Sequence, residues 1–231
     1  MLNLNKISFN SKKYSTKILN LIIFNKKYKF NIATGFVIDT SELKDIDNID
    51  LSVLNQTKKY IVRSAAFGED AENASFAGIF KSIQDVDVNN IKEAIKIVNE
   101  SFYSKKSLIY QKLKNVYIKP QILIQEMIES KYSIVIFIKN NKIDFSFIEG
   151  NCSQIVSGVK NVKEFSFFID DLKKVKEELY KNKIYKKMKL IEFIEQLIIL
   201  KKNFKEKKSI DIEATYDGDK WFLLQYRELN I

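Results

Sequence analysis

The chain has 231 residues, which is enough for one large domain or two small ones, each with a hydrophobic core. Its 45% hydrophobic and 13% aromatic content excludes a disordered chain, and no apolar run approaches the roughly 20 residues of a membrane-spanning helix. The single cysteine, Cys152, excludes an internal disulfide. Since there is no histidine, the chain cannot form a Ser-His-Asp triad or carry a phosphohistidine, and zinc and haem sites are disfavoured.

The formal net charge of +10 raises the question of nucleic-acid binding. The lysines are spread along the whole chain, and aromatic residues do not alternate with them as they do on a base-stacking surface. A biased composition therefore explains the charge better than a nucleic-acid patch does. The N-terminal residues 1–6 have no signal-peptide core, so we expect a cytoplasmic protein that does not bind a membrane.

In its first half the sequence alternates between short strands and helices. Apolar runs and turn residues predict, in order, a helix over 18–23, strands over 33–39, 60–62 and 79–86, and helices over 91–102 and 105–113. The strand over 60–62 ends at Arg63, and small residues crowd the segment that follows it. A strand that delivers an arginine to a small-residue loop is typical of a phosphate-binding site, because the backbone there can approach a ligand closely.

Arginine is scarce in this lysine-rich chain, since Arg63 and Arg227 are the only two arginines among 39 basic residues. A guanidinium group binds phosphate or carboxylate oxygens in a bidentate fork that lysine cannot copy. We therefore expect both arginines to bind anionic groups of a ligand. The alternative is that both make structural ion pairs.

After Pro120 the sequence turns to β-strands, interrupted by one long helical stretch. The expected elements are strands over 122–128, 132–138 and 143–148, a helical region over 171–205, and two closing strands over 209–214 and 221–227. An Asp-Gly pair at 217–218 joins the closing strands and is a strong hairpin signal. We accordingly divide the chain into subdomains over residues 1–120 and 121–231.

The closing hairpin predicts a site for a metal–phosphate complex. Because successive side chains of a strand point to opposite faces, Asp211 and Glu213 share one face of the first strand. Gln225 and Arg227 likewise share one face of the second strand. If the two faces coincide, two carboxylates, an amide and a guanidinium converge, as binding of a magnesium–phosphate complex requires. The alternative is a solvated sheet face with cross-strand ion pairs.

The segment around Arg63 and the closing hairpin also carry motifs of a known family. Residues 62–66, 69–70 and 74–78 resemble the pattern VRSSA-x-x-ED-x-x-x-x-SFAG of the nucleotide-binding domain of phosphoenolpyruvate synthase and pyruvate phosphate dikinase. Residues 211–213 and 224–227 are similar to its DIE and LQ-x-R strands. Shorter matches at 34–37, 123–127 and 156–158 follow in the same order, so the resemblance covers nearly the whole chain.

The resemblance implies an α+β architecture of the ATP-grasp type, in which two subdomains with mostly antiparallel sheets clasp ATP. The N-terminal subdomain would hold the phosphate loop, and the C-terminal one the adenine and metal side. The family roles fall on the following residues: phosphate binding and catalysis on Arg63 and Arg227, Mg²⁺ binding on Glu213 and Gln225, support of that network on Asp211, adenine binding on Gln125 and Met127, and the phosphate-binding lysine on Lys12 or Lys13.

The resemblance further implies an ATP-dependent phosphotransferase. The chain would pass a phosphoryl or pyrophosphoryl group from MgATP to a histidine on a separate swivel-domain protein, and a further enzyme would act on the final substrate. Ile134 and Ile138 stand where the family has a glycine and a threonine, and Ser153 stands where it has an acidic residue. These departures motivate an alternative, a catalytically degenerate nucleotide-binding regulatory subunit.

Overall fold

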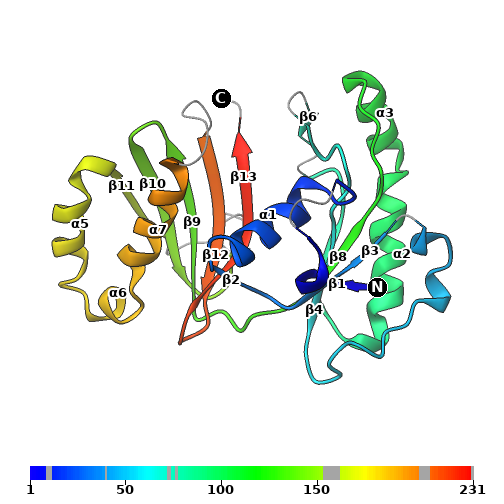
Figure 1. The fold of residues 1–231 in the computed structure, drawn as a ribbon, viewed down its shortest axis with the longest axis horizontal. Coiled ribbons are helices and arrows are strands. Elements are labelled where there is room, and N and C mark those ends of the chain that lie inside the picture. The colour runs from blue at the N-terminus through cyan, green and yellow to red at the C-terminus, as the bar shows by residue number, and fades with distance from the viewer. Residues whose placement is uncertain are drawn as a thin grey trace. The chain divides into compact units, whose positions relative to one another are not determined.

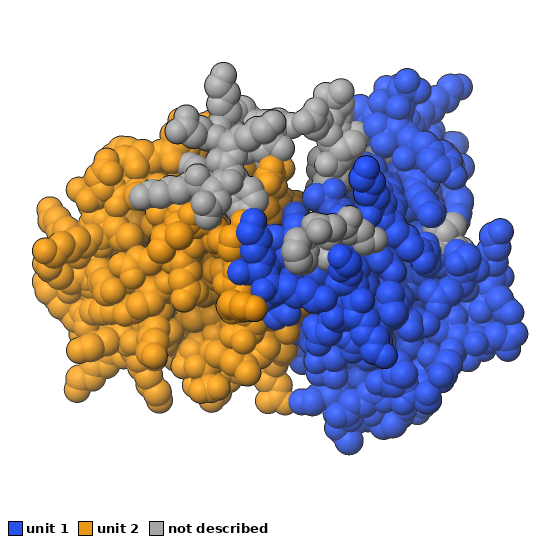
Figure 2. All heavy atoms as spheres, viewed as in Figure 1, with its two compact units in different colours: residues 1–27, 33–127 blue, residues 28–32, 128–231 orange. Residues whose placement is uncertain are grey.

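The computed structural model describes residues 1–8, 12–39, 41–71, 74–75, 78–152, 162–202 and 209–229. The chain divides into two compact units (Figure 2): unit 1 comprises residues 1–27 and 33–127, and unit 2 comprises residues 28–32 and 128–231. The strand over 122–126, which the sequence-based division placed in the second subdomain, belongs to unit 1 because it pairs with two strands there. Among the described residues, no helix is both long and apolar enough to cross a bilayer.

Unit 1 is built on an antiparallel sheet. In its described part five strands lie in the order β1-β3-β8-β4-β7 (Figure 1). Their bounds are β1 Leu2–Asn3, β3 Gly35–Ile38, β8 Ile122–Glu126, β4 Tyr60–Ser64 and β7 Ser82–Val86. The helices are α1 Thr16–Lys26, α2 Ile91–Phe102 and α3 Lys105–Lys114, with short 3-10 helices η1 Leu4–Lys6, η2 Glu42–Lys44, η3 Ile46–Asn48 and η4 Val88–Asn90. Two short strands that pair antiparallel, β5 Asp70–Ala71 and β6 Ala74–Ser75, follow β4.

The core of unit 1 explains why α2 forms where the sequence predicts it. The apolar side chains at positions 91, 94, 95, 98 and 102 are buried together with Tyr60, Val62, Ile122 and Ile124 of the sheet. An apolar stripe of this spacing stabilises a helix by packing on a sheet rather than by intrinsic propensity. Since side chains alternate along β4, burial of Tyr60 and Val62 on the α2 side directs Arg63 to the opposite face of the sheet.

Unit 2 is also α+β. Within its described residues six strands lie in the order β11-β10-β9-β12-β13-β2, all antiparallel except the β13–β2 pair. The bounds are β2 Asn31–Ile32, β9 Tyr132–Lys139, β10 Lys142–Glu149, β11 Lys163–Phe168, β12 Ser209–Tyr216 and β13 Trp221–Leu229. The helical elements are η5 Ile169–Asp171, α5 Leu172–Leu179, α6 Lys183–Lys187 and α7 Leu190–Lys202 (Figure 1). The α+β class with mostly antiparallel sheets is thus confirmed.

One face of the unit 2 sheet is buried beneath helices. The ring of Tyr185 in α6 meets Phe147 of β10 edge-on, with ring centroids 5.2 Å apart. The ring of Phe193 in α7 stacks on Trp221 of β13, with centroids 5.0 Å apart. The predicted helical region over 171–205 is divided in the described residues into α5, α6 and α7. Its interruptions lie at Asn182, whose side chain caps α6, and at Lys189, which has a positive φ of 52°.

Candidate functional site

Four polar side chains lie together on the other face of the unit 2 sheet. In the β12–β13 register Asp211 lies opposite Arg227 and Glu213 lies opposite Gln225, so all four share one face. The Arg227 Nη2 atom is 3.1 Å from Asp211 Oδ2 and 3.4 Å from Glu213 Oε1. Gln225 Nε2 donates to Glu213 Oε1 at 3.4 Å. The strands therefore bring two carboxylates, an amide and a guanidinium into one cluster, which we call the acidic-face cluster.

The acidic-face cluster is only partly open to solvent. The side chains of Asp211, Glu213 and Arg227 are 20%, 21% and 29% exposed. Burial raises the pKa of Asp211, and the positive charge of Arg227 opposes that rise. The Arg227 Nε atom is buried and has no hydrogen-bond partner among the described residues. A buried donor beside a half-shielded pair of carboxylates suits a site that receives an anion together with a cation.

Two of the three departures from the family pattern lie away from this cluster. Ile134 pairs with Ala214 and Ile138 pairs with Ile210, and both isoleucines are fully buried. Because Asp211 and Glu213 alternate with these partners on β12, the isoleucines point to the helix-covered side of the sheet. The change to isoleucine at both positions therefore enlarges the core and leaves the acidic face unaltered. Ser153 lies outside the described residues.

Cys152 is buried beside the same strands. Its Sγ atom donates to the backbone oxygen of Ala214 at 3.4 Å, and the residue is 4% exposed. Burial, with the charge of Glu213 as a second cause, raises the pKa of the Cys152 thiol to about 12. The thiolate is the reactive form of cysteine, so the native protein presents an inert thiol at neutral pH.

We expect Cys152 to react with a disulfide reagent at pH 8 at least ~100-fold more slowly in the native than in the unfolded protein, because reaction requires both exposure and ionisation. Release of the coloured thiolate from Ellman's reagent, with and without denaturant, measures this ratio. The chain's one cysteine makes the readout unambiguous. Immediate stoichiometric reaction with an unchanged circular dichroism spectrum would show that the thiol is accessible.

Arg63 and Gln125, both predicted ligand residues, lie on the same face of the unit 1 sheet. Arg63 pairs with Leu123, and Ile61 pairs with Gln125, across β4 and β8. Arg63 is half-buried, whereas Gln125 is buried. Gly35 lies opposite Gln125, and a Cβ atom there would be 2.9 Å from Gln125 Cγ and 2.7 Å from Leu4 Cδ1. The glycine at the start of β3 is therefore required by close packing on this face.

The other predicted ligand residues of unit 1, Met127, Lys12 and Lys13, lie outside its strands and helices. Met127 follows β8, and its Sδ atom accepts a hydrogen bond from the backbone N–H of Asp85 at 3.3 Å. Lys12 and Lys13 lie in the turn before α1, and both are exposed. Lys13 Nζ is 2.8 Å from Asp39 Oδ2, and this carboxylate raises the pKa of Lys13.

A lysine that the sequence reasoning missed lies next to Arg63. Lys17, in the first turn of α1, donates from Nζ to the backbone oxygen of Ser64 at 2.9 Å and forms an ion pair with Glu69. The Glu69 carboxylate also accepts from the Ser64 hydroxyl and from the Ala66 backbone N–H, each at 3.1 Å. Lys17 and Glu69 thus hold the backbone that follows Arg63. No sequence signal distinguishes Lys17 from the many other lysines of the chain.

Replacing Lys17 with methionine is expected to lower the free energy of unfolding by about 1–2 kcal/mol. The substitution leaves the largely buried Glu69 carboxylate without its ion-pair partner. The loss stays limited because Ser64 and Ala66 still donate hydrogen bonds to this carboxylate. The matched control is Lys13→Met, which breaks a lysine–carboxylate pair whose lysine side chain is 58% exposed and should cost less than about 0.5 kcal/mol. Urea unfolding of the two variants measures the difference. Equal losses would show that Lys17 does not hold this turn.

Comparison with known proteins identifies the family. Residues 43–231 match the family described as "Pyruvate phosphate dikinase, AMP/ATP-binding domain". No curated protein sequence matches the chain. Among solved structures it is similar to PH1788 from Pyrococcus horikoshii Ot3, with a TM-score of 0.53 and 10% identity over 94% of this chain and 91% of that one.

Two further solved structures resemble the chain. Acetyl-coenzyme A synthetase 1 from Ca. Korarchaeum cryptofilum gives a TM-score of 0.52 and 11% identity, with 91% of each chain covered. D-alanine–D-alanine ligase from Helicobacter pylori gives a TM-score of 0.45 and 14% identity over 93% of this chain, which spans 50% of that ligase. The chain has the ATP-grasp fold and belongs to the family of pyruvate phosphate dikinase AMP/ATP-binding domains.

Proposed function

We propose that this chain is an ATP-dependent phosphotransfer module that passes a phosphoryl or pyrophosphoryl group from MgATP to a histidine on a separate polypeptide. The observation that carries the proposal is the acidic-face cluster, because Asp211, Glu213, Gln225 and Arg227 meet within hydrogen-bonding distance in a member of an ATP-binding family. The 231 residues contain no histidine, so the scheme requires an acceptor histidine outside them. A further enzyme would then transfer the group to the final substrate.

The residues of the acidic-face cluster fit a magnesium ion. Mg²⁺ prefers hard oxygen ligands and usually binds one or two carboxylates together with water and substrate phosphates. Glu213 and Gln225 would supply protein oxygens to the ion, and Asp211 would support them. Among the described residues there is no group of three or more histidine, cysteine or acidic side chains of the kind that forms an all-protein cage. This donor set suits an ion that also binds phosphate oxygens.

The basic residues would position the phosphates and stabilise negative charge. Phosphoryl transfer depends mainly on positioning and charge stabilisation, so a module without a histidine base can perform it. Arg63 and Arg227 would contact phosphate oxygens with their planar guanidinium groups. The phosphate-binding lysine is proposed to be Lys12 or Lys13, which are exposed in the turn before α1, because the Lys17 ammonium is already engaged by Ser64 and Glu69. Bound Mg²⁺ would supply further neutralisation of the phosphate charge.

The adenine contact is proposed for the end of β8. Gln125 offers an amide on the same face as Arg63, and Met127 offers an adaptable apolar side chain two residues later. An amide and a thioether beside each other suit a planar heterocycle with polar edges. Transfer would break a P–O bond of ATP and form a P–N bond to the imidazole of the acceptor; ADP would leave after phosphoryl transfer or AMP after pyrophosphoryl transfer, and the imidazole proton would pass to solvent.

Two labels on ATP test the proposed transfer and its type. The protein is incubated with ATP labelled at the γ or the β phosphorus and with the histidine-bearing swivel domain of a phosphoenolpyruvate synthase as acceptor. Acid-labile, base-stable label on the acceptor is expected, and β label appears only if a pyrophosphoryl group moves. The control acceptor has alanine in place of its histidine. Saturable MgATP binding without any transfer would favour the regulatory-subunit alternative instead.

A further inference from the structure

Helix α3 in unit 1 exposes apolar side chains. Leu108, Ile109 and Leu113 are 51%, 50% and 77% exposed, and of the ten residues of α3 only Ser107 is buried. Tyr103 and Tyr117, at the two ends of the helix, are 58% and 86% exposed. Single exposed apolar residues are ordinary, but a group of them along one helix marks an interaction surface.

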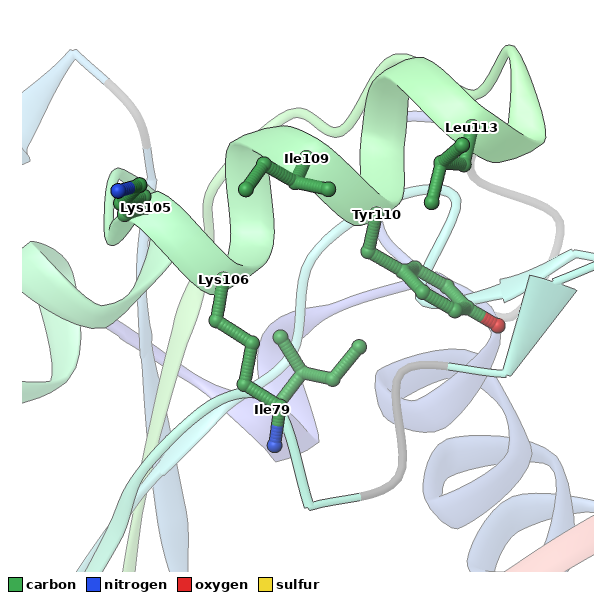
Figure 3. A pocket seen from close by; sticks show the side chains of 6 residues that line it. All are labelled: Ile79, Lys105, Lys106, Ile109, Tyr110 and Leu113. Atoms are coloured by element: carbon green, nitrogen blue, oxygen red, sulfur yellow. The ribbon is translucent and has the colours of Figure 1, made fainter.

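A hollow of about 460 Å³ lies beside this helix (Figure 3). It is lined by Ile79, Lys105, Lys106, Ile109, Tyr110 and Leu113. In Figure 3 the side chain of Lys106 runs beside Ile79, in agreement with the hydrogen bond of 3.2 Å from Lys106 Nζ to the backbone oxygen of Gly78. The hollow therefore has apolar walls and ammonium groups at its edge.

The charge on α3 has a single sign. Its sequence contains Lys105, Lys106, Lys112 and Lys114 and no acidic residue. The Lys114 Nζ atom lies 5.9 Å from the centre of the Tyr110 ring, so positive charge is present at this end of the hollow as well. An apolar hollow between lysines complements a partner that carries apolar side chains flanked by carboxylates.

The positive charge of α3 also favours some kinds of binding partner over others. A second copy of the chain would carry the same lysines and the same net charge of +10, so charge repulsion opposes self-association here. Of the residues that line the hollow, Ile79, Ile109 and Leu113 are aliphatic, and Tyr110 is the one ring among them on which a base could stack. An acidic amphipathic protein segment matches both the apolar and the charged features.

We propose that α3 and Ile79 form a docking site for an acidic amphipathic helix of a partner protein. The partner's apolar side chains would fill the hollow against Ile109 and Leu113, and its carboxylates would face Lys105 and Lys106. This is the helix-in-groove mode, in which anchors spaced three and four residues apart enter an apolar groove. The site is distinct from the proposed nucleotide residues, and its occupation does not depend on the proposed phosphotransfer.

A designed peptide tests the docking site. The probe is a fluorescent helical peptide of roughly 20 residues, with leucines at i, i+3, i+4 and i+7 and glutamates on the flanking positions. Fluorescence anisotropy should give saturable binding. The double variants Ile109→Ser with Leu113→Ser and Lys105→Glu with Lys106→Glu should each weaken it by roughly tenfold or more. The single variant Leu113→Ser, at the most exposed of these positions, should also weaken it.

Matched controls lie on unit 2. Lys173→Glu with Lys174→Glu changes an exposed lysine pair on α5, and Ile184→Ser removes an exposed isoleucine on α6. Both should leave the dissociation constant within about twofold of the unmodified protein. Circular dichroism melts verify that every variant is folded.

Several results would overturn the docking proposal. These are the absence of saturable peptide binding, equal affinity in all variants, or tighter binding of a peptide with lysine in place of glutamate. Variant-sensitive binding to vesicles of phosphatidylcholine and phosphatidylglycerol, or to an RNA duplex, that exceeds peptide binding would assign the surface to a membrane or to nucleic acid. A dimer in sedimentation that Leu113→Ser dissociates would assign it to a second copy.

Discussion

Replacing Glu213 with glutamine is expected to abolish the Mg²⁺ dependence of ATP binding while leaving the melting temperature of the nucleotide-free protein nearly unchanged. Glutamine keeps the shape of the side chain but removes the negative charge that a hard cation requires. The stability should change by less than about 1 kcal/mol, because Arg227 keeps its closer contact with Asp211 at 3.1 Å, against 3.4 Å to Glu213.

Calorimetric titration of Glu213→Gln with ATP, in Mg²⁺ and in EDTA, measures the effect. The unmodified protein should bind at least ~100-fold more tightly with Mg²⁺, a difference of about 3 kcal/mol, and the variant should bind equally in both conditions. Glu164→Gln is the matched control, because Glu164 is an exposed glutamate on the same face of this sheet, on the edge strand β11. A variant that melts several degrees lower yet binds MgATP normally would make Glu213 a structural partner in the hairpin.

The variant Arg63→Lys is expected to keep its fold and to bind ATP about 1–3 kcal/mol more weakly, which corresponds to roughly a 5–150-fold rise in the dissociation constant. The substitution preserves the positive charge but removes the planar fork that binds two oxygens at once. Arg63 lies at the end of β4, on the face opposite the α2 core, so a lysine there should not disturb the buried packing.

Comparing ligands of different charge distinguishes a phosphate contact from a general loss of binding. Affinity for ATP should fall in Arg63→Lys, whereas affinity for adenosine should remain within about twofold, since adenosine has no phosphate. Ser82→Ala serves as the control, because Ser82 is the exposed cross-strand neighbour of Arg63 on β7. Unchanged ATP affinity in a folded Arg63→Lys protein would exclude the phosphate role.

The elements that the sequence predicted best are those with strong periodicity. The apolar stripe of α2 and the alternating pattern of β12 and β13 predict burial on one side, and the packing in both units follows it. The Asp-Gly pair at 217–218 predicted the connecting turn, where Gly218 has a φ of +113°. These patterns suffice because each reflects local geometry that tertiary contacts reinforce.

Features that depend on distant contacts could not be predicted in this way. The strand β2 joins the edge of the unit 2 sheet beside β13, although residues close to it on either side belong to unit 1. Lys17 acquires its partners Ser64 and Glu69 only when α1 and β4 come together, and in the sequence it is one lysine among many. The period-two pattern also had to be combined with the strand register to show that Ile134 and Ile138 face away from Asp211 and Glu213.

The most direct test of the account is calorimetric titration of the unmodified protein with MgATP. The account predicts saturable binding of one nucleotide per chain in the micromolar range, weakened at least ~100-fold by EDTA and largely insensitive to moderate salt. The absence of a saturable binding signal with MgATP, or ATP binding of equal affinity in EDTA, would contradict the assignment of the acidic-face cluster to a magnesium–nucleotide complex.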